Sequence, residues 1–212
     1  MQFLFAMLFV LLFSTNLYAF DCEVDGIYYN RLSTDEFEVT NGTNKYTGDI
    51  VIPETVTYRD KMFKVTQIGN SAFNSCKDLI SVSIPRGVTI IKQSAFGGCS
   101  SLVSITIPQG VNSIESSVFE GCTSIPSIVL PEGITSIGSN AFQNCSSLTS
   151  ISIPEGVTSL QQRTISGCNN LTSITLPESL TEIRTYVFWG CSSLTSITLP
   201  KGVKHILGYA FQ

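Results

Sequence analysis

Apolar side chains recur along most of this chain at fixed offsets within a unit of 23 residues. One unit reads C-x-x-L-x-x-I-x-I-P-x-x-V-x-x-I-x-x-x-A-F-x-x-C, and the unit that opens at Cys122 is representative. Residues 127–130 of that unit alternate between polar and apolar side chains, which predicts a half-buried β-strand. Pro131 ends the strand because proline cannot donate to a strand ladder, and the Glu-Gly that follows supplies a bend.

The second half of the unit predicts a return path. Residues 134–137 form a second short extended segment. The Gly-Ser-Asn at 138–140 then resembles the cap of a single helical turn, which would carry Ala141 and Phe142. We therefore expect each unit to contain two short extended segments and one helical turn.

The period is regular enough to define the architecture. Six of the seven cysteines are 23 residues apart: Cys76, Cys99, Cys122, Cys145, Cys168 and Cys191. Six of the eight prolines keep the same spacing: Pro85, Pro108, Pro131, Pro154, Pro177 and Pro200. A period between 20 and 29 with Leu and Ile at set offsets indicates a leucine-rich-repeat solenoid. One unit cannot bury enough apolar surface to fold alone, so units must stack, with parallel strands about 4.8 Å apart.

The two ends of the chain differ from the repeat. Residues 1–19 contain an uncharged apolar core that is too short to span a bilayer comfortably, followed by polar residues and Ala19, which predicts a cleaved signal peptide. The alternatives are an uncleaved membrane anchor and a buried first strand. Residues 20–65 contain two predicted hairpins, around 33–36 and 59–61, which we expect to cap the solenoid. Residues 66–212 form the predicted solenoid. Its last repeat is incomplete, so we expect a fragment of a longer protein or a frayed last coil.

The repeat resembles the BspA-like leucine-rich repeats of surface and secreted proteins from Bacteroidales, other oral and gut bacteria, and trichomonads. The similarity is carried by LTSISIPEGV (148–157) and SIGSNAFQNC (136–145), and it covers residues 66–212. The unit opening at Cys145 departs from the pattern, with Thr164-Ile165 in place of Ala-Phe. The resemblance implies a right-handed solenoid that mediates adhesion, microbial co-aggregation or contact with innate immune receptors. It implies no catalytic residues.

Composition narrows the possible functions. Charged residues are 13% of the chain and the net charge is −4, without a basic stripe, which disfavours nucleic-acid binding. The six periodic cysteines would lie in a line inside the stack, which suits buried free thiols better than disulfides or a metal centre. His205, the sole histidine, is expected to be exposed. Glu132, Glu155 and Glu178 form an acidic row that we interpret as a solvated edge. We expect no cofactor, no metal and no enzymatic activity.

The positions that stacking leaves free are the candidates for function. The outward side chains of the first strand are almost all Ser or Thr, and no aromatic platform lies among them. Trp189 lies at an offset occupied by varied residues in other units, which predicts exposure; the alternative is packing against a following unit. The candidate protein-binding residues are Ser104, Thr106, Ser127, Ser150, Ser152, Ser173, Thr175, Trp189, Ser196 and Thr198.

These observations favour a mainly β solenoid that acts as a secreted or cell-surface adhesion and protein-binding module. The expected partner is a host matrix protein, a host receptor or another microbial surface protein. We expect a monomer and no transmembrane segment in the mature chain. The alternative is a structural spacer within a larger surface protein whose functional domain lies beyond residue 212.

Overall fold

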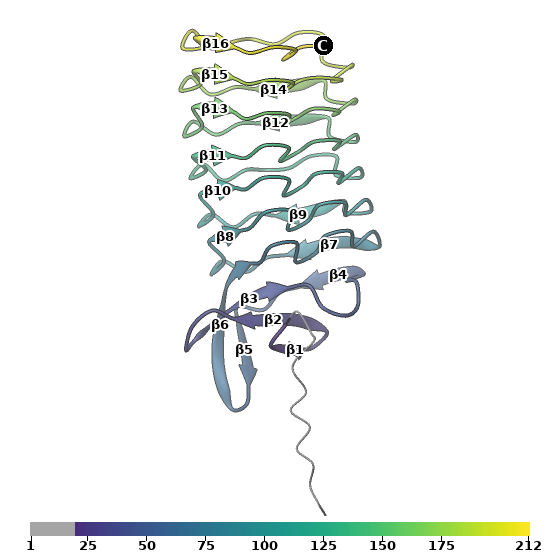
Figure 1. Cartoon of the computed structure of the whole chain (residues 1–212), viewed down its shortest axis with the longest axis vertical. Coiled ribbons are helices and arrows are strands. Elements are labelled where there is room, and N and C mark those ends of the chain that lie inside the picture. Colours follow the sequence, from purple (N-terminus) through teal and green to yellow (C-terminus); the bar gives the residue numbers. More distant parts are fainter. Residues whose placement is uncertain (1–19) are drawn as a thin grey trace, which may run out of the picture.

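The computed structural model describes residues 20–212 and shows an elongated stack of coils with the N-terminal hairpins at one end (Figure 1). The predicted signal peptide at 1–19 lies outside the described residues. Each unit contributes one coil, and equivalent residues of successive coils lie in register. Thus Ser150, Ile151 and Ser152 pair with the residues 23 positions later. The predicted solenoid of stacked short parallel strands is confirmed.

The coils build two walls of parallel strands, which run up opposite sides of the stack in Figure 1. The first wall contains β4 (Gly48–Val51), β7 (Leu79–Ser83), β9 (Ser104–Thr106), β12 (Ser150–Ser152) and β14 (Ser173–Thr175). The second wall contains β6 (Lys61–Ile68), β8 (Ile90–Ile91), β10 (Ser113–Ile114), β11 (Ser136–Ile137), β13 (Ser159–Leu160), β15 (Glu182–Ile183) and β16 (His205–Ile206).

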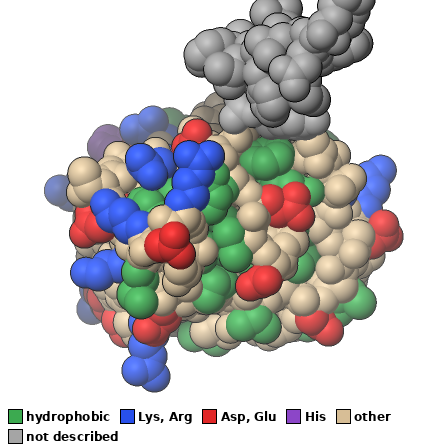
Figure 2. Space-filling view, turned by 90° about the horizontal axis from the view of Figure 1, so that it is seen from below, with side chains coloured by type: hydrophobic (Ala, Val, Ile, Leu, Met, Phe, Trp, Pro, Cys, Tyr) green, Lys and Arg blue, Asp and Glu red, His purple; other side chains and the backbone are tan. Residues whose placement is uncertain are grey.

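The N-terminal residues form the two predicted hairpins, which cover the lower end of the stack. The remaining strands are β1 (Cys22–Val24), β2 (Ile27–Arg31), β3 (Glu36–Thr40) and β5 (Thr55–Tyr58). β2 pairs with β3 and β5 pairs with β6, both antiparallel. β3 also runs parallel to β6, which in turn pairs with β8 of the first coil, so β6 crosses the predicted boundary at residue 65. Figure 2 shows this end from below, with Lys and Arg side chains gathered on one side.

A file of aromatic rings forms the centre of the core. Phe73, Phe96, Phe119 and Phe142 stack with centroids 5.1–5.6 Å apart and planes within 11° of parallel. Tyr46 of the cap region extends the file at 4.5 Å from Phe73. The rings meet because the same offset recurs in each coil.

The unit with the departing Thr-Ile pair keeps its core position filled. Ile165 replaces the ring and is fully buried. The hydroxyl of Thr164 is also buried and donates to the Gln161 carbonyl at 2.7 Å. Aromatic stacking then resumes between Phe188 and Phe211, at 5.0 Å.

The predicted helical turn is wrong, since residues 20–212 contain no helix. The segment after the second strand forms consecutive turns, in which Ser117 and Asn140 have positive φ. In these turns alternate N–H groups point toward the next coil. The N–H groups of Ser117 and Phe119 donate to carbonyls in the following coil, at 2.9 and 2.8 Å. A helical turn would have used these donors within its own coil and left the coils unjoined on this side.

The first wall is interrupted in the unit that opens at Cys122. The predicted strand at 127–130 keeps only one bridge, from Ser127 to the next coil. Pro126 explains the interruption, because it has no N–H. One coil earlier, Val103 donates its N–H to the Ile80 carbonyl at 2.9 Å, and Pro126 cannot repeat this bond. The first wall therefore consists of two sheets, β4-β7-β9 and β12-β14.

Candidate protein-binding surface

All ten residues predicted to bind a partner are exposed. Nine of them lie on the outer side of the first wall or on its continuation beyond β14. We call this surface the hydroxyl face; it comprises Ser81, Ser83, Ser104, Thr106, Ser127, Val129, Ser150, Ser152, Ser173, Thr175, Ser196 and Thr198. The parallel register places these side chains in two columns along the stack.

Hydroxyl groups on and beside this face have different roles. Thr149 and Thr172 use their hydroxyls within the fold, each donating to the carbonyl at the same position of the preceding coil at 3.1 Å. In contrast, the hydroxyls of Ser127, Ser150 and Thr175 make no hydrogen bond to another residue within 20–212. The face can therefore offer donors and acceptors to a partner without breaking intramolecular bonds.

An apolar patch interrupts the hydroxyl face at the unit containing Pro126. The Val129 side chain is 81% exposed, and Ile80 and Val103, which lie at the Pro126 offset in the two preceding coils, are each 46% exposed. A hollow of about 290 Å³ lies beside Val129, between this coil and Ser152 of the next.

Trp189 lies outside the hydroxyl face, on the turn side of the stack, and is 48% exposed. Its predicted exposure is confirmed. The premise, that varied residues at one offset indicate exposure, does not hold in every unit. At the same offset in other units Gly97 and Ser166 are buried. Variety at this position therefore reflects tolerance of small residues as well as contact with solvent.

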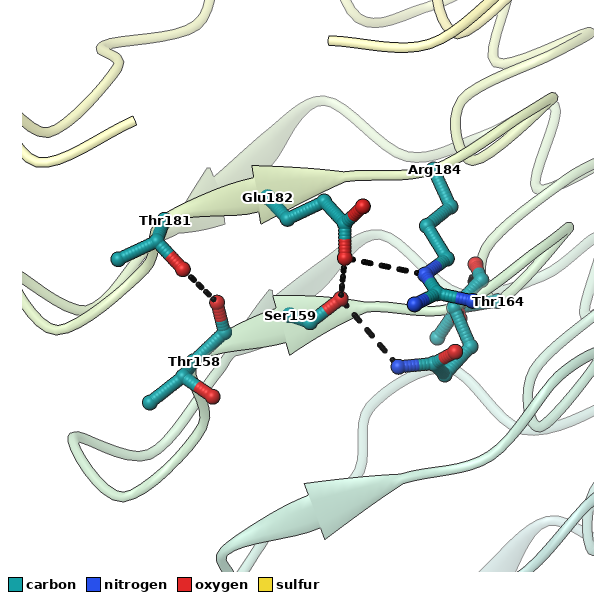
Figure 3. Close-up of polar contacts among 7 residues, drawn as sticks. Thr158, Ser159, Thr164, Thr181, Glu182 and Arg184 are labelled. Atoms are coloured by element: carbon teal, nitrogen blue, oxygen red, sulfur yellow. Dashed lines mark hydrogen bonds and ion pairs between the residues drawn. The ribbon is translucent and has the colours of Figure 1, made fainter. Parts of the chain in front are cut away.

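The second wall carries a polar network on β13 and β15 (Figure 3). The Glu182 carboxylate accepts hydrogen bonds from Arg184 and from the Ser159 hydroxyl, both at 3.1 Å. These bonds, chiefly the one from Arg184, lower the pKa of the Glu182 carboxyl. Gln161 in turn donates to the Ser159 hydroxyl at 3.3 Å. Arg184 is therefore already occupied by a carboxylate of its own coil.

Sequence reasoning missed a second group of exposed and half-buried residues on the turn side. Arg163, Tyr186 and Tyr209 occupy one offset in three successive coils, where earlier coils have Ser or Asn. The Arg163 guanidinium lies over the Tyr186 ring, 5.2 Å from its centroid, and Tyr186 stacks on Tyr209 at 5.2 Å. A comparison of this single offset across units would have revealed the change in residue type.

The cysteine file is part of the core. All seven cysteines are free and buried, which confirms the prediction made for the six periodic ones. In the file, each thiol from Cys99 onward donates to the backbone carbonyl 26 residues earlier, at 3.0–3.3 Å. Burial raises the pKa of Cys168 to about 12. A thiol held protonated and out of solvent is a poor nucleophile.

The other candidate reactive groups lie apart. His205 is exposed on β16, and the carboxylates of Glu132, Glu155 and Glu178 are exposed along one bend, as predicted. Within residues 20–212, no group of three or more His, Cys, Asp or Glu side chains is placed to hold a metal ion. Nor does that part of the chain contain a helix long and apolar enough to cross a membrane.

Comparison with known proteins identifies the family. The BspA-type leucine-rich repeat region matches residues 66–192 in six copies, which is more than half of the chain. The chain therefore belongs to the BspA-type leucine-rich repeat family. No curated protein sequence matches it.

Solved structures of bacterial leucine-rich repeat proteins have the same fold. A leucine-rich repeat protein from Bacteroides ovatus is 33% identical over 90% of this chain and 56% of its own, with a TM-score of 0.76. A leucine-rich cell surface protein from Faecalibacterium prausnitzii is 33% identical over 90% of this chain and 51% of its own, with a TM-score of 0.79. The T. pallidum leucine-rich repeat protein is 28% identical, with 83% and 91% coverage and a TM-score of 0.66. The chain thus spans about half the length of the first two structures.

Proposed function

We propose that this protein is a secreted or cell-surface adhesion module that binds host or microbial proteins through the hydroxyl face. Its family and its likeness to a leucine-rich cell surface protein support a role in protein binding at a surface. Solenoids of this kind present long surfaces on which successive repeats each add a small contact. The observation that carries the proposal is the run of exposed hydroxyls from Ser83 onward along the first wall, which make no hydrogen bond within the described residues, with the apolar patch around Val129 at its centre; the Ser81 hydroxyl, at the lower end of the face, is bonded to Asp49.

The apolar patch and the hydroxyls would contribute differently to binding. Burial of Val129 and Val103 under a partner would supply affinity, because Val129 is 81% and Val103 46% exposed in the free chain. The surrounding Ser and Thr side chains would form hydrogen bonds that fix the register of the partner. A central apolar contact with a polar rim is the usual anatomy of a protein interface.

A binding assay with charge-insertion variants tests this proposal. The purified chain is titrated onto immobilised extracellular-matrix proteins and fixed epithelial cells. Lysines are then introduced on the hydroxyl face as Thr106→Lys, Val129→Lys and Ser152→Lys, in three neighbouring coils. Burial of three unpaired ammonium groups should weaken binding by at least about tenfold.

The second wall provides a matched control. Asn112, Thr135 and Thr158 lie at one offset of the same three coils and are also exposed. Lysines at these positions add the same charge and should leave binding unchanged. No saturable binding to any of the surfaces would favour the spacer interpretation. If both triple variants lose binding equally, the hydroxyl face is not the binding surface.

A further inference from the structure

Four side chains on the turn side form what we call the aromatic edge: Arg163, Tyr186, Trp189 and Tyr209. The first feature of this edge is that the fold does not require its residues. The offset shared by Arg163, Tyr186 and Tyr209 has left-handed backbone in every coil, with φ of 54–61°. The four earlier coils have small or amide side chains at this offset, namely Ser71, Ser94, Ser117 and Asn140. Residues other than glycine are uncommon in this conformation, Asn is among the best tolerated of them, and neither Arg nor Tyr is favoured there. The backbone at this offset therefore gives no reason for Arg or Tyr in three successive coils.

The second feature is that the edge forms an ordered stack outside the core. The Arg163 guanidinium lies 5.2 Å from the Tyr186 centroid. The Tyr186 and Tyr209 rings are 5.2 Å apart with planes 9° from parallel. Trp189, three residues after Tyr186, is 48% exposed. Stacked aromatic side chains lose little conformational freedom when a partner covers them, which is why Tyr, Trp and Arg dominate contact hot spots.

The third feature is the charge of the edge. The two ion pairs within the described residues are Lys92–Glu38 and Arg184–Glu182. Arg163 is exposed, and no carboxylate in that part of the chain lies within ion-pair distance of its guanidinium. Its neighbour Arg184 is already bonded to Glu182, so Arg163 is the cation of this edge that can accept an external anion. Stacking on Tyr186 holds the guanidinium in place while its N–H groups stay available.

We infer that the aromatic edge is a docking site for an acidic segment of a partner protein. A carboxylate of the segment binds the Arg163 guanidinium, and an adjacent aliphatic or aromatic side chain packs on Tyr209 and Trp189. A polyanion such as a sulfated glycan would need a row of cations, whereas this edge offers a single free guanidinium. The inference rests on the proposed function and adds to it a second contact surface with a defined partner chemistry.

The test uses peptide selection on the whole chain. A phage library of random dodecapeptides is selected on the wild type and on the triple variant R163S/Y186S/Y209S. This variant carries at each position the residue that earlier coils have at the same offset. Peptides recovered on the wild type are synthesised and titrated, with the emission of Trp189, the sole tryptophan, as the signal.

The wild type should recover peptides with Asp or Glu beside an apolar residue, and the triple variant should bind them at least about tenfold more weakly. Its thermal unfolding midpoint should fall by no more than a few degrees, because earlier coils fold with Ser at this offset and the lost ring contacts lie outside the core. Variant S94N/S117N, altered at the same offset in earlier coils, should bind as the wild type does. The inference is overturned if no peptide is recovered, if the recovered peptides are basic, or if the triple variant binds them equally.

The two proposals can fail separately. The Lys variant of the hydroxyl face should still bind the selected peptides, because its changes lie on the first wall. If no peptide is recovered while matrix proteins still bind through the hydroxyl face, the docking site is wrong and the proposed function stands. If neither peptides nor matrix proteins bind, both are wrong.

Discussion

Truncation of Phe119 to alanine removes the middle ring from the aromatic file at the centre of the core. This side chain is fully buried and lies 5.6 Å from the rings of both Phe96 and Phe142. Removal of a buried phenylalanine side chain costs about 3–5 kcal/mol, because transfer free energy is lost and a cavity remains. The coils above and below are tied by backbone bonds and cannot collapse onto the gap, so we expect a cost in the upper half of this range.

Part of this cost should come from the contact between rings. A double-mutant cycle of Phe96→Leu and Phe119→Leu isolates the pair, and a stacked pair contributes about 0.5–1.5 kcal/mol beyond its buried area. The free energy of unfolding is measured by urea titration with far-UV circular dichroism. Val129→Ala serves as a control, since that side chain is 81% exposed and its loss should cost less than about 0.5 kcal/mol. A cost below about 1 kcal/mol for Phe119→Ala, or no coupling in the cycle, would refute the reasoning.

Three further predictions follow from the packing of the coils. Gly138→Ala should destabilise the protein by about 1–3 kcal/mol, because an added Cβ would lie 2.6 Å from the backbone nitrogen of Ser116. In the same urea titration the control Gly133→Ala should be nearly neutral, because its Cβ would meet nothing nearer than 3.7 Å. Raising the pH above 9 should lower the free energy of unfolding, since burial holds the pKa of Cys168 at about 12 in the folded chain and the unfolded thiol ionises first. Between the two pKa values, each such thiol lowers the free energy of unfolding by about 1.4 kcal/mol per pH unit, so Cys168→Ser should make the dependence on pH shallower by that amount. An unchanged dependence would contradict the raised pKa of Cys168. The thiols of the cysteine file should not react with iodoacetamide in native protein and should all react in urea, as mass spectrometry would show; rapid native labelling would contradict their burial.

The inward positions and the coil architecture could be predicted because every coil imposes the same requirement. An apolar residue at a core offset contacts its equivalents above and below, so the sequence period is the structural period. The two hairpins were also predictable, since β2 and β3, and β5 and β6, flank short polar turns. Residue Ile165 fills a core position despite its departure from the pattern, because the position requires burial and volume more than a ring.

Other features depend on bonds between coils, which one unit read alone does not reveal. The expected helical turn satisfied the local pattern, but the N–H groups of that segment bond to the next coil. Pro126 interrupts the first wall because it has no N–H to donate to the carbonyl of Val103, which lies 23 positions earlier in the preceding coil. The aromatic edge is not visible in the consensus of the repeat, because its offset accepts different residues in different coils. The residue type at the Tyr186 offset changes from Ser or Asn in the early coils to Arg or Tyr in the late coils. This change, which only a comparison of the coils reveals, indicates a distinct surface.

The central claim is that each unit stacks in register on the preceding one, so that whole coils are interchangeable. Deletion of residues 122–144 tests this most directly, because it removes one complete unit and joins equivalent points of two coils. The shortened chain should fold, unfold cooperatively in urea and keep its remaining file thiols protected from iodoacetamide. Deletion of residues 122–133 removes about half a unit, shifts every later core position out of register and should abolish the urea transition. Loss of folding in the first variant, or equal folding in both, would contradict the account.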